Sequence, residues 1–524
     1  MGEHARTSSR WTAIPFHALI AVLTLAAVYG SRPRTQVAKP IVIPAPLPAK
    51  AAVKLWLSTA DRRLRLAPQP DVEIGASAGA PADAVIDIDI HRTYQSIVGF
   101  GAALTDSSAW LLQNRMDGPQ RHALLQELFG PPPNLGLTMT RLTIGASDFS
   151  LKQYTLDDLP RGGVDPSLQY FNVASSLRDV IPTVREVMAI DPQLRIIASP
   201  WSAPAWMKTS TNLIGGALLE QYESTYADYL VKYVDTYRGY GIPIFALTLQ
   251  NEPGFIPMTY PGMDLPASMQ ARIIAQYLGP ALASRKAKTR ILAWDHNWDE
   301  REQPLSLLAD PDAARYIDGI AWHCYRGDPD AQSLVHRAFP GKDTYITECS
   351  GGDWASSRHG ELLWFARDLL LAGLRNWARG VVYWNLALDE HYGPHFGGCG
   401  SCKGLVVIDS RTGEVSRNDE YYAFAHFSRF VLPGAVRVRS SAAEKDIAIA
   451  DVAFRNAHDG TVVLVLVNSD TDARSVFVRQ GETRFRYTMP PQSVATFVWN
   501  PAQLPGSWAT RVRRWSKRHT LRLP

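Results

Sequence analysis

Short apolar segments alternate with longer helical patterns eight times between residues 94 and 426, and this alternation constrains the fold most strongly. The segments read QSIVGFG, LTMTRLTIG, LRIIASP, IFALTLQ, TRILAWD, DGIAWHC, DTYITE and GVVYWNLAL. Eight strand–helix repeats are typical of a closed (β/α)₈ TIM barrel in the α/β class. An open doubly wound sheet is the alternative, but no G-x-G-x-x-G fingerprint opens a helix in this sequence. We therefore expect residues 94–426 to form the barrel.

The two ends of the chain carry short alternating segments that are typical of strands. VKLWLST and AVIDIDIH lie within residues 51–93, and GTVVLVLVNS and SVATFVWN lie within residues 427–500. Gly, Asn and Asp turns separate these segments. We expect both ends to join in one all-β sandwich domain associated with the barrel.

The first 30 residues have the pattern of an export signal. Arg6 and Arg10 precede an apolar run from Trp11 to Tyr29, and a Pro- and Ala-rich linker follows over residues 31–50. An uncleaved membrane anchor is the alternative, because the run approaches the length that crosses a bilayer. Either interpretation places the remaining chain outside the cytoplasm, whether periplasmic, extracellular or membrane-anchored.

The formal charge of +4 is concentrated at the C-terminal end of the chain. Residues 501–524 carry six basic residues and no acid, so residues 1–500 have a charge of 4 − 6 = −2. This balance does not suggest a nucleic-acid groove in the body of the protein. The basic tail is interpreted as a solvated end, with an arm for anionic surfaces as the alternative.

Four cysteines occur, at positions 324, 349, 399 and 402. The Cys399-Gly-Ser-Cys402 spacing resembles half of a zinc site or a redox motif, but neither a second ligand pair nor a thioredoxin-like context accompanies it. In an exported protein a disulfide between Cys399 and Cys402 is the better expectation. Cys349 follows Glu348 directly and is expected to be sensitive to oxidation.

Two glutamates follow apolar segments that should lie on opposite sides of the barrel. Glu252 follows the fourth segment and Glu348 ends the seventh. Strand ends converge on one face of such a barrel, so both carboxyl groups can face a common centre. Glycoside hydrolysis uses such a pair, one as acid and one as nucleophile. We expect a raised pKa at Glu252 and an ionised Glu348 supported by Arg141.

Several motifs, in order along the chain, resemble glycoside hydrolase family thirty, the acid glucosylceramidase (glucocerebrosidase) family. They are GFGAALTD at 99–106, DFS at 148–150, SPWSAPAWMKT at 199–209, NEP at 251–253, TE at 347–348 and WNLAL at 384–388. NEP is shared by many barrel glycosidases, whereas the first and third motifs together are much more specific.

This resemblance implies retaining cleavage, with Glu252 as acid/base and Glu348 as nucleophile. It implies no metal and no cofactor. The residues that it implies for the sugar pocket are Asp106, Trp201, Asn251, Trp384, Tyr260, His323 and Tyr325. A core histidine bonded to the backbone is the alternative for the residue at position 323.

The resemblance favours an exo-β-glucosidase of the glucosylceramidase type acting on a carbohydrate or glycolipid. A β-1,6-glucanase, a β-xylosidase or a β-fucosidase with the same catalytic pair is the alternative. A carbohydrate-binding protein without activity is the alternative of another class, and the presence of both glutamates argues against it. Membrane contact is expected only through the N-terminal segment or a lipid substrate, and the sequence sets no oligomeric state.

Overall fold

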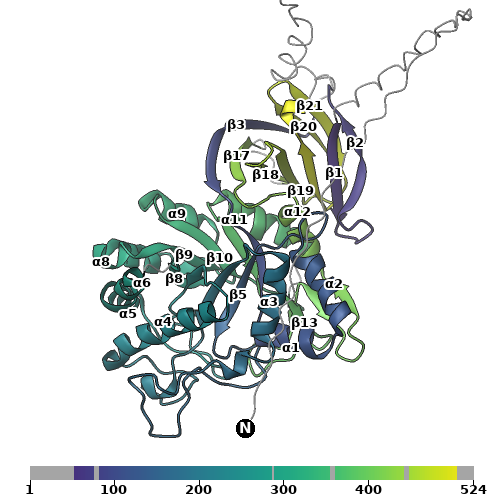
Figure 1. Cartoon of the computed structure of the whole chain (residues 1–524). Helices are drawn as coiled ribbons and strands as arrows, with labels where there is room; N and C mark the ends of the chain where they lie inside the picture. The colour runs from purple at the N-terminus through teal and green to yellow at the C-terminus, as the bar shows by residue number, and fades with distance from the viewer. Residues whose placement is uncertain (1–51, 76–81, 286–287, 355–359, 442–447, 504–524) are drawn as a thin grey trace, which may run out of the picture. The chain divides into compact units, whose positions relative to one another are not determined.

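The computed structural model describes residues 52–75, 82–285, 288–354, 360–441 and 448–503 (Figure 1). The expected signal or anchor, the linker and the basic tail from residue 504 onward lie outside the described residues. Among the described helices, none is both long enough and apolar enough to cross a bilayer.

Eight parallel strands close into a barrel, which confirms the fold predicted from the alternating segments. Each predicted segment contains or overlaps one barrel strand. In order around the barrel they are β10 (Asp343–Glu348), β12 (Gly380–Tyr383), β4 (Gly99–Ala103), β5 (Met139–Ile144), β6 (Arg195–Pro200), β7 (Ala246–Leu247), β8 (Arg290–Asn297) and β9 (Ile317–His323).

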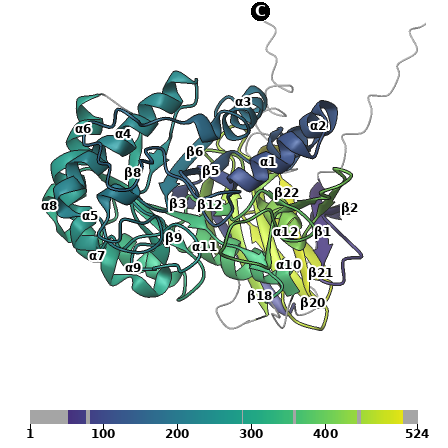
Figure 2. The ribbon, with the colours of Figure 1, turned by 90° about the horizontal axis from the view of Figure 1, so that it is seen from below.

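Helices follow the barrel strands, and Figure 2 shows α4 to α9 outside strands β8 and β9. Two of the helical segments continue through a π-helical turn, Ile274–Leu278 after α5 and Phe365–Leu371 after α10. The helices are α1 (Asp106–Asn114), α2 (Gly118–Phe129), α3 (Val180–Ile190), α4 (Glu223–Gly239), α5 (Ala267–Ile273), α6 (Gly279–Ser284), α7 (Glu302–Ala309), α8 (Pro311–Ala314), α9 (Asp330–Ala338), α10 (Gly360–Trp364), α11 (Ala372–Arg375) and α12 (Asp419–Ser428).

Both ends of the described chain meet in a nine-stranded sheet, as predicted. The N-terminal strand β1 pairs with the C-terminal strand β22, and β3 pairs with β17 and β20. This domain encloses its own apolar core. In sheet order the strands are β2 (Ala67–Glu73), β1 (Ala52–Thr59), β22 (Ser493–Trp499), β19 (Val462–Asn468), β18 (Ile449–Arg455), β17 (Val436–Ser441), β3 (Ala84–Ser96), β20 (Arg474–Gln480) and β21 (Thr483–Met489).

Five short strands order the loops that follow barrel strands β10 and β12. In the first small sheet, β11 (Gly351–Gly352) pairs with β14 (Cys402–Lys403). In the second, β15 (Val406–Ile408) lies between β13 (Ala387–Leu388) and β16 (Val415–Arg417). The loop after the nucleophile candidate Glu348 is thereby tied to the loop that carries Cys402.

The barrel interior contains two successive layers of side chains. Seven strands contribute what we call the apolar layer: Met139, Ile197, Ala246, Leu292, Ala321, Tyr345 and Val382. Inward-facing positions recur every second residue along a strand. Two residues further toward the carboxyl ends, six of these strands carry Arg141, Ser199, Thr248, His323, Thr347 and Trp384. Together with Asp295 from β8, these residues form what we call the polar layer, and the site lies directly above it.

Candidate active site

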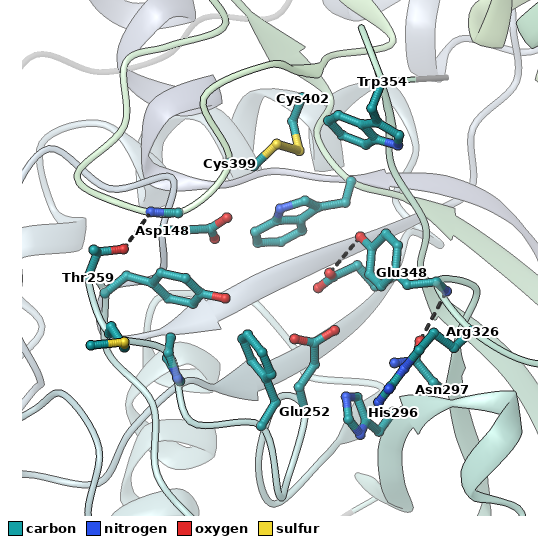
Figure 3. A pocket seen from close by; sticks show the side chains of 17 residues that line it. Asp148, Glu252, Thr259, His296, Asn297, Arg326, Glu348, Trp354, Cys399 and Cys402 are labelled. Carbon is teal, nitrogen blue, oxygen red and sulfur yellow. Dashed lines mark hydrogen bonds between the residues drawn. A yellow bond between two sulfur atoms is a disulfide. The ribbon is translucent and has the colours of Figure 1, made fainter. Parts of the chain in front are cut away.

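A pocket of about 640 Å³ opens at the carboxyl ends of the barrel strands (Figure 3). Its described lining is formed by side chains from the strand ends and from the following loops. They are Asp148, Glu252, Phe255, Pro257, Met258, Thr259, Tyr260, His296, Asn297, Tyr325, Arg326, Glu348, Trp354, Trp384, Gly398, Cys399 and Cys402.

The two predicted glutamates face one another across this pocket. One carboxylate oxygen of Glu252 and one of Glu348 lie within 4.8 Å of each other. Retaining glycosidases place their carboxyl groups about 5–5.5 Å apart, whereas inverting enzymes need a larger gap for a water molecule. The spacing in this pocket fits direct attack by one carboxylate.

The backbone around Glu252 is held in an unusual conformation. Its φ of 48° lies in the left-handed region, which residues with a side chain seldom adopt. The Glu252 N–H donates to the carbonyl oxygen of Asp295 at 3.0 Å, and the Asn251 N–H donates to that of Pro200 at 2.8 Å. These bonds to neighbouring strands stabilise the conformation and direct the Glu252 side chain into the pocket.

Arg141 and Tyr325 both donate to Glu348. The guanidinium Nη1 of Arg141 lies 2.5 Å from Glu348 Oε2, and Tyr325 Oη lies 2.8 Å from Oε1. Arg141 is fully buried and also stacks against Trp201 and Trp384, 4.9 and 5.6 Å from their ring centroids. The expected support of Glu348 by Arg141 is therefore present in the structure.

Asp295 is the central acceptor of the polar layer. Its carboxylate accepts hydrogen bonds from five side chains: Arg141, Ser199, Thr248, Thr347 and His323. Burial alone would raise the pKa of Asp295, but Arg141 and His323 hold it far below its usual range. This buried anion fixes the side chains on which the two glutamates depend.

His323 joins Asp295 to Glu252. Its Nε2 lies 3.1 Å from Asp295 Oδ1, and its Nδ1 lies 3.0 Å from Glu252 Oε1. Burial would lower the pKa of His323, but the charge of Glu348 and the bonds to Asp295 and Glu252 raise it to about 9. His323 is thus neither a pocket-lining residue nor a histidine bonded to backbone; it is a buried cation behind Glu252.

This arrangement shifts the pKa of Glu252 in the direction opposite to the one expected from the sequence. Burial favours the neutral form of Glu252, but the hydrogen bond and charge of His323 lower the pKa of Glu252. Burial raises the pKa of Glu348, and the nearby Glu252 charge adds to it, against the opposing charges of His323 and Arg141. The expectation for Glu252 considered only its repulsion from Glu348, because the contact with His323 could not be predicted from the sequence.

The other predicted sugar-binding residues occupy different depths. Tyr260, Tyr325 and Trp384 line the pocket. Trp201 lies behind Trp384, with ring centroids 5.1 Å apart and planes at 22°. Asn251 is buried, and its Oδ1 accepts from Arg141 Nη2 at 2.7 Å. Neither Trp201 nor Asn251 is among the described residues that line the pocket.

Asp106 does not lie in this pocket, and Asp148 lines it instead. Thr105 caps α1, so Asp106 occupies the first turn of that helix. Its Oδ2 accepts from Ser150 and Tyr154 beside a separate hollow of about 360 Å³. Asp148 follows β5 and burial holds its pKa well above the usual range. The DFS motif contains this second aspartate, but no pattern along the chain distinguishes it from Asp106 as a pocket residue.

All four cysteines lie at the barrel mouth in two disulfides. The expected Cys399–Cys402 bond is present and lines the pocket. Cys324 and Cys349 form the second bond, with their Cα atoms 5.3 Å apart. The expectation of an oxidation-sensitive thiol at Cys349 was therefore wrong, because its partner is 25 residues away in sequence but on the adjacent strand.

Glu252, His323 and Glu348 also satisfy the spacing of a metal-ligand set, with one donor atom of each within 4.8 Å. The donor atoms are already engaged, however, since His323 bonds Glu252 and Tyr325 and Arg141 bond Glu348. A divalent cation here would also lie beside the Arg141 charge, so the donor set fits proton transfer better than ion binding.

A parallel barrel that presents two carboxyl groups at this spacing over buried cationic and aromatic side chains defines a retaining glycoside hydrolase. Residues 97–431 match the glycosyl hydrolase family 30 TIM-barrel domain, and residues 434–497 match the family 30 beta sandwich domain. The chain belongs to glycosyl hydrolase family 30.

Relatives within this family carry two different activities in their names. The chain is 36% identical to endo-1,6-beta-D-glucanase neg1 of Aspergillus fumigatus over 77% of this chain and 85% of that protein. It is 31% identical to putative glucosylceramidase 4 of Caenorhabditis elegans, over 82% and 86%. Among solved structures, the endo-beta1,6-glucanase BT3312 is similar at 32% identity, with a TM-score of 0.78 and coverage of 86% and 99%.

Proposed function

We propose that this enzyme is a β-1,6-glucanase that cleaves within the glucan chain by double displacement, with Glu348 as nucleophile and Glu252 as acid/base. The carboxylate pair within 4.8 Å supports the mechanism. The similarity to endo-1,6-glucanases, at higher identity than to the nematode glucosylceramidase relative, supports the substrate. The sequence resemblance favoured an exo-β-glucosidase of the glucosylceramidase type, with a β-1,6-glucanase as the alternative. The identities reverse that preference.

In the first step, a Glu348 oxygen attacks the anomeric carbon of the bound glucose. The bond between that carbon and the leaving oxygen breaks, and Glu252 protonates the leaving oxygen, which is O6 of the next glucose. The products of this step are a glycosyl ester on Glu348 and a shortened chain with a free hydroxyl group. Tyr325 and Arg141 hold the attacking carboxylate in place through hydrogen bonds.

In the second step, Glu252 removes a proton from water, and the water oxygen attacks the same carbon. The ester bond breaks, Glu348 leaves as a carboxylate, and the product keeps the β configuration. Each carboxyl group returns to its starting state. No group outside the described chain and the water is required.

The hydrogen bond between His323 and Glu252 supplies the proton that the first step needs. The site holds this proton as protonated His323 beside ionised Glu252, 3.0 Å apart. Transfer along that bond gives neutral Glu252, while Asp295 keeps the Nε2 proton in place. The proton that Glu252 takes from water in the second step returns along the same bond to His323. His323 thus lets Glu252 act as an acid although its own pKa is lowered in the free enzyme.

Asp148, Trp384 and the Cys399–Cys402 disulfide form the wall on which we place the reacting glucose. A carboxyl group accepts hydrogen bonds from sugar hydroxyls, and an indole packs on the apolar face of a sugar ring. The exposed side chains at the rim, among them Phe255 and Met258, then face the leaving portion of the chain.

Product analysis tests the proposal. We expect purified enzyme to release a series of oligosaccharides from linear β-1,6-glucan, and proton NMR to show the β anomer first. β-1,3-Glucan and β-1,4-xylan should be cleaved far more slowly. Release of glucose alone would contradict internal cleavage, and faster hydrolysis of glucosylceramide than of β-1,6-glucan would restore the glucosylceramidase interpretation.

We also propose that the enzyme acts outside the cytoplasm, on the basis of the apolar N-terminal run that follows Arg6 and Arg10. Fractionation of expressing cells, with and without residues 1–30, tests this location.

A further inference from the structure

The disulfide between Cys324 and Cys349 joins the two strands that carry most of the catalytic cluster. Cys324 lies between His323 and Tyr325 at the end of β9, and Cys349 directly follows Glu348 at the end of β10. Both half-cystines are buried, with 8% and 0% exposure. The bond therefore lies beside the site, one residue away from Glu348 and from the two residues that approach it, His323 and Tyr325.

Backbone pairing between β9 and β10 becomes irregular at this level. The parallel register is regular up to Ile346, which pairs with Trp322, and then shifts before the final pair of Glu348 with His323. No further pair follows along these two strands in the described structure. The disulfide thus crosses the strand ends where the hydrogen-bonded ladder stops fixing their separation.

Two contacts depend on that separation. Tyr325 Oη lies 2.8 Å from Glu348 Oε1, and His323 Nδ1 lies 3.9 Å from the same oxygen. Hydrogen bonds weaken steeply as distance and angle depart from ideal values. A misplacement of about 1 Å at a reacting group can reduce the rate by roughly 100-fold.

We propose that the Cys324–Cys349 disulfide is a positioning element that keeps Tyr325 and His323 in contact with Glu348, in addition to stabilising the fold. The proposal rests on the nucleophile role given to Glu348 above. Cys399–Cys402 provides the contrast, because it lies at the same barrel mouth but closes a loop that carries neither glutamate.

The test compares the Cys324→Ala/Cys349→Ala pair with the Cys399→Ala/Cys402→Ala pair on an aryl β-glucoside, at a temperature where both are folded. For the first pair we expect kcat to fall by roughly 10- to 100-fold with KM changed by less than about 3-fold. Tyr325 lowers the pKa of Glu348, so weakening this contact should also move the acid limb of the kcat/KM profile to higher pH. The second pair lines the pocket and therefore serves as the control for the acid limb alone, which should keep its wild-type position.

A double-mutant cycle with Tyr325→Phe identifies the contact through which the disulfide acts. Tyr325→Phe should reduce kcat in the wild type but have little further effect once Cys324 and Cys349 are alanine. Equal effects in both backgrounds, or lost stability with an unchanged kcat and acid limb, would overturn the proposal.

Two further results distinguish the positioning role from a purely structural role of the disulfide and from a failure of the proposed mechanism. If the alanine pair does not fold, Cys324→Ala/Cys349→Val restores side-chain volume at the fully buried position and replaces it in the same measurements. Failure of both pairs to fold would make the disulfide a folding requirement and overturn the positioning role. Full activity of Glu348→Gln would instead remove the proposed mechanism, whatever the cysteine variants show.

Discussion

The apolar layer and the polar layer of the barrel lie two residues apart on the same strands, yet one consists of hydrophobic side chains and the other mainly of charged and polar ones. Met139 and Ile197 are buried among apolar neighbours, whereas Arg141 and Ser199, two residues further along, hydrogen-bond the buried Asp295. Both layers exclude water almost completely. Burial of the apolar layer stabilises the fold. Burial of the polar layer removes its hydration, and only the hydrogen bonds and ion pairs within the layer offset that cost.

This contrast separates stability from chemistry within one closed sheet. Because both layers lie on the same strands, one strand register sets the positions of the side chains in both. The apolar layer therefore positions the polar layer without contacting a substrate. Substitutions in the active site, at the carboxyl ends of the strands, should therefore change kcat or kcat/KM. Substitutions in the apolar layer should change the free energy of unfolding.

The largest effect is expected at Glu348. Glu348→Gln keeps the shape of the side chain but removes the attacking carboxylate, so kcat on an aryl β-glucoside should fall by at least about 1,000-fold. The free energy of unfolding should stay within about 1 kcal/mol of wild type in urea titrations. Activity close to wild type would remove Glu348 from the mechanism and with it the division between the layers.

Glu252→Ala should show an effect that depends on the leaving group. For poor leaving groups, kcat/KM should fall by about 100- to 10,000-fold, because the departing oxygen needs the proton. For a dinitrophenyl glucoside the fall in kcat/KM should be below about 10-fold, since that oxygen leaves as a stable anion. Steady-state kinetics over a series of aryl glucosides measures this slope, and equal losses on all of them would contradict the acid role.

Leu292→Ala tests the apolar layer. Removing a fully buried leucine should lower the free energy of unfolding by about 2–5 kcal/mol. The kcat of the folded variant should remain within about 3-fold of wild type, because Leu292 packs in the apolar layer and the polar layer separates it from the site. Urea titration and kinetics at low temperature measure the two quantities, and a large loss of kcat with little loss of stability would contradict the division.

The alternation of apolar segments was sufficient to predict the barrel, since inward positions on parallel strands are specified by neighbouring residues along the chain. Strand ends also carry function in this fold, so Glu252 and Glu348 could be singled out from the sequence. Both β-rich ends could be assigned to one domain because their strand patterns were strong.

Contacts between strands could not be predicted in the same way. The Cys324–Cys349 bond and the His323–Glu252 bond depend on the shifted registers at the ends of β8, β9 and β10. The family resemblance implied Asp106 for the sugar pocket, whereas in the structure Asp106 lies in the first turn of α1, accepts from Ser150 and Tyr154, and does not line the pocket. Register shifts and helix caps of this kind involve one or two residues and leave the apolar pattern unchanged.

The smallest effect we predict is a pH dependence of stability that belongs to the polar layer alone. The pKa of His323 is about 9 in the folded protein, above its ordinary 6.5, so the folded state binds the proton more tightly than the unfolded state. This contribution, up to about 3 kcal/mol, is fully present below pH 6.5 and is lost as the pH rises through 9.

Urea titrations between pH 6 and pH 10 should show this contribution as a decline in the free energy of unfolding, and His323→Gln should reduce that decline. Glu420, with a pKa near 8, and Lys208, with a pKa near 7, titrate in both proteins, so the difference between the two curves reports His323 together with the carboxyl groups whose pKa values it lowers. Leu292→Ala should lower the whole curve while keeping its wild-type slope, because no titratable group is removed. A slope that is unchanged in His323→Gln would mean that the buried histidine is neutral in the folded enzyme, and the proton for Glu252 would then have to come from another source.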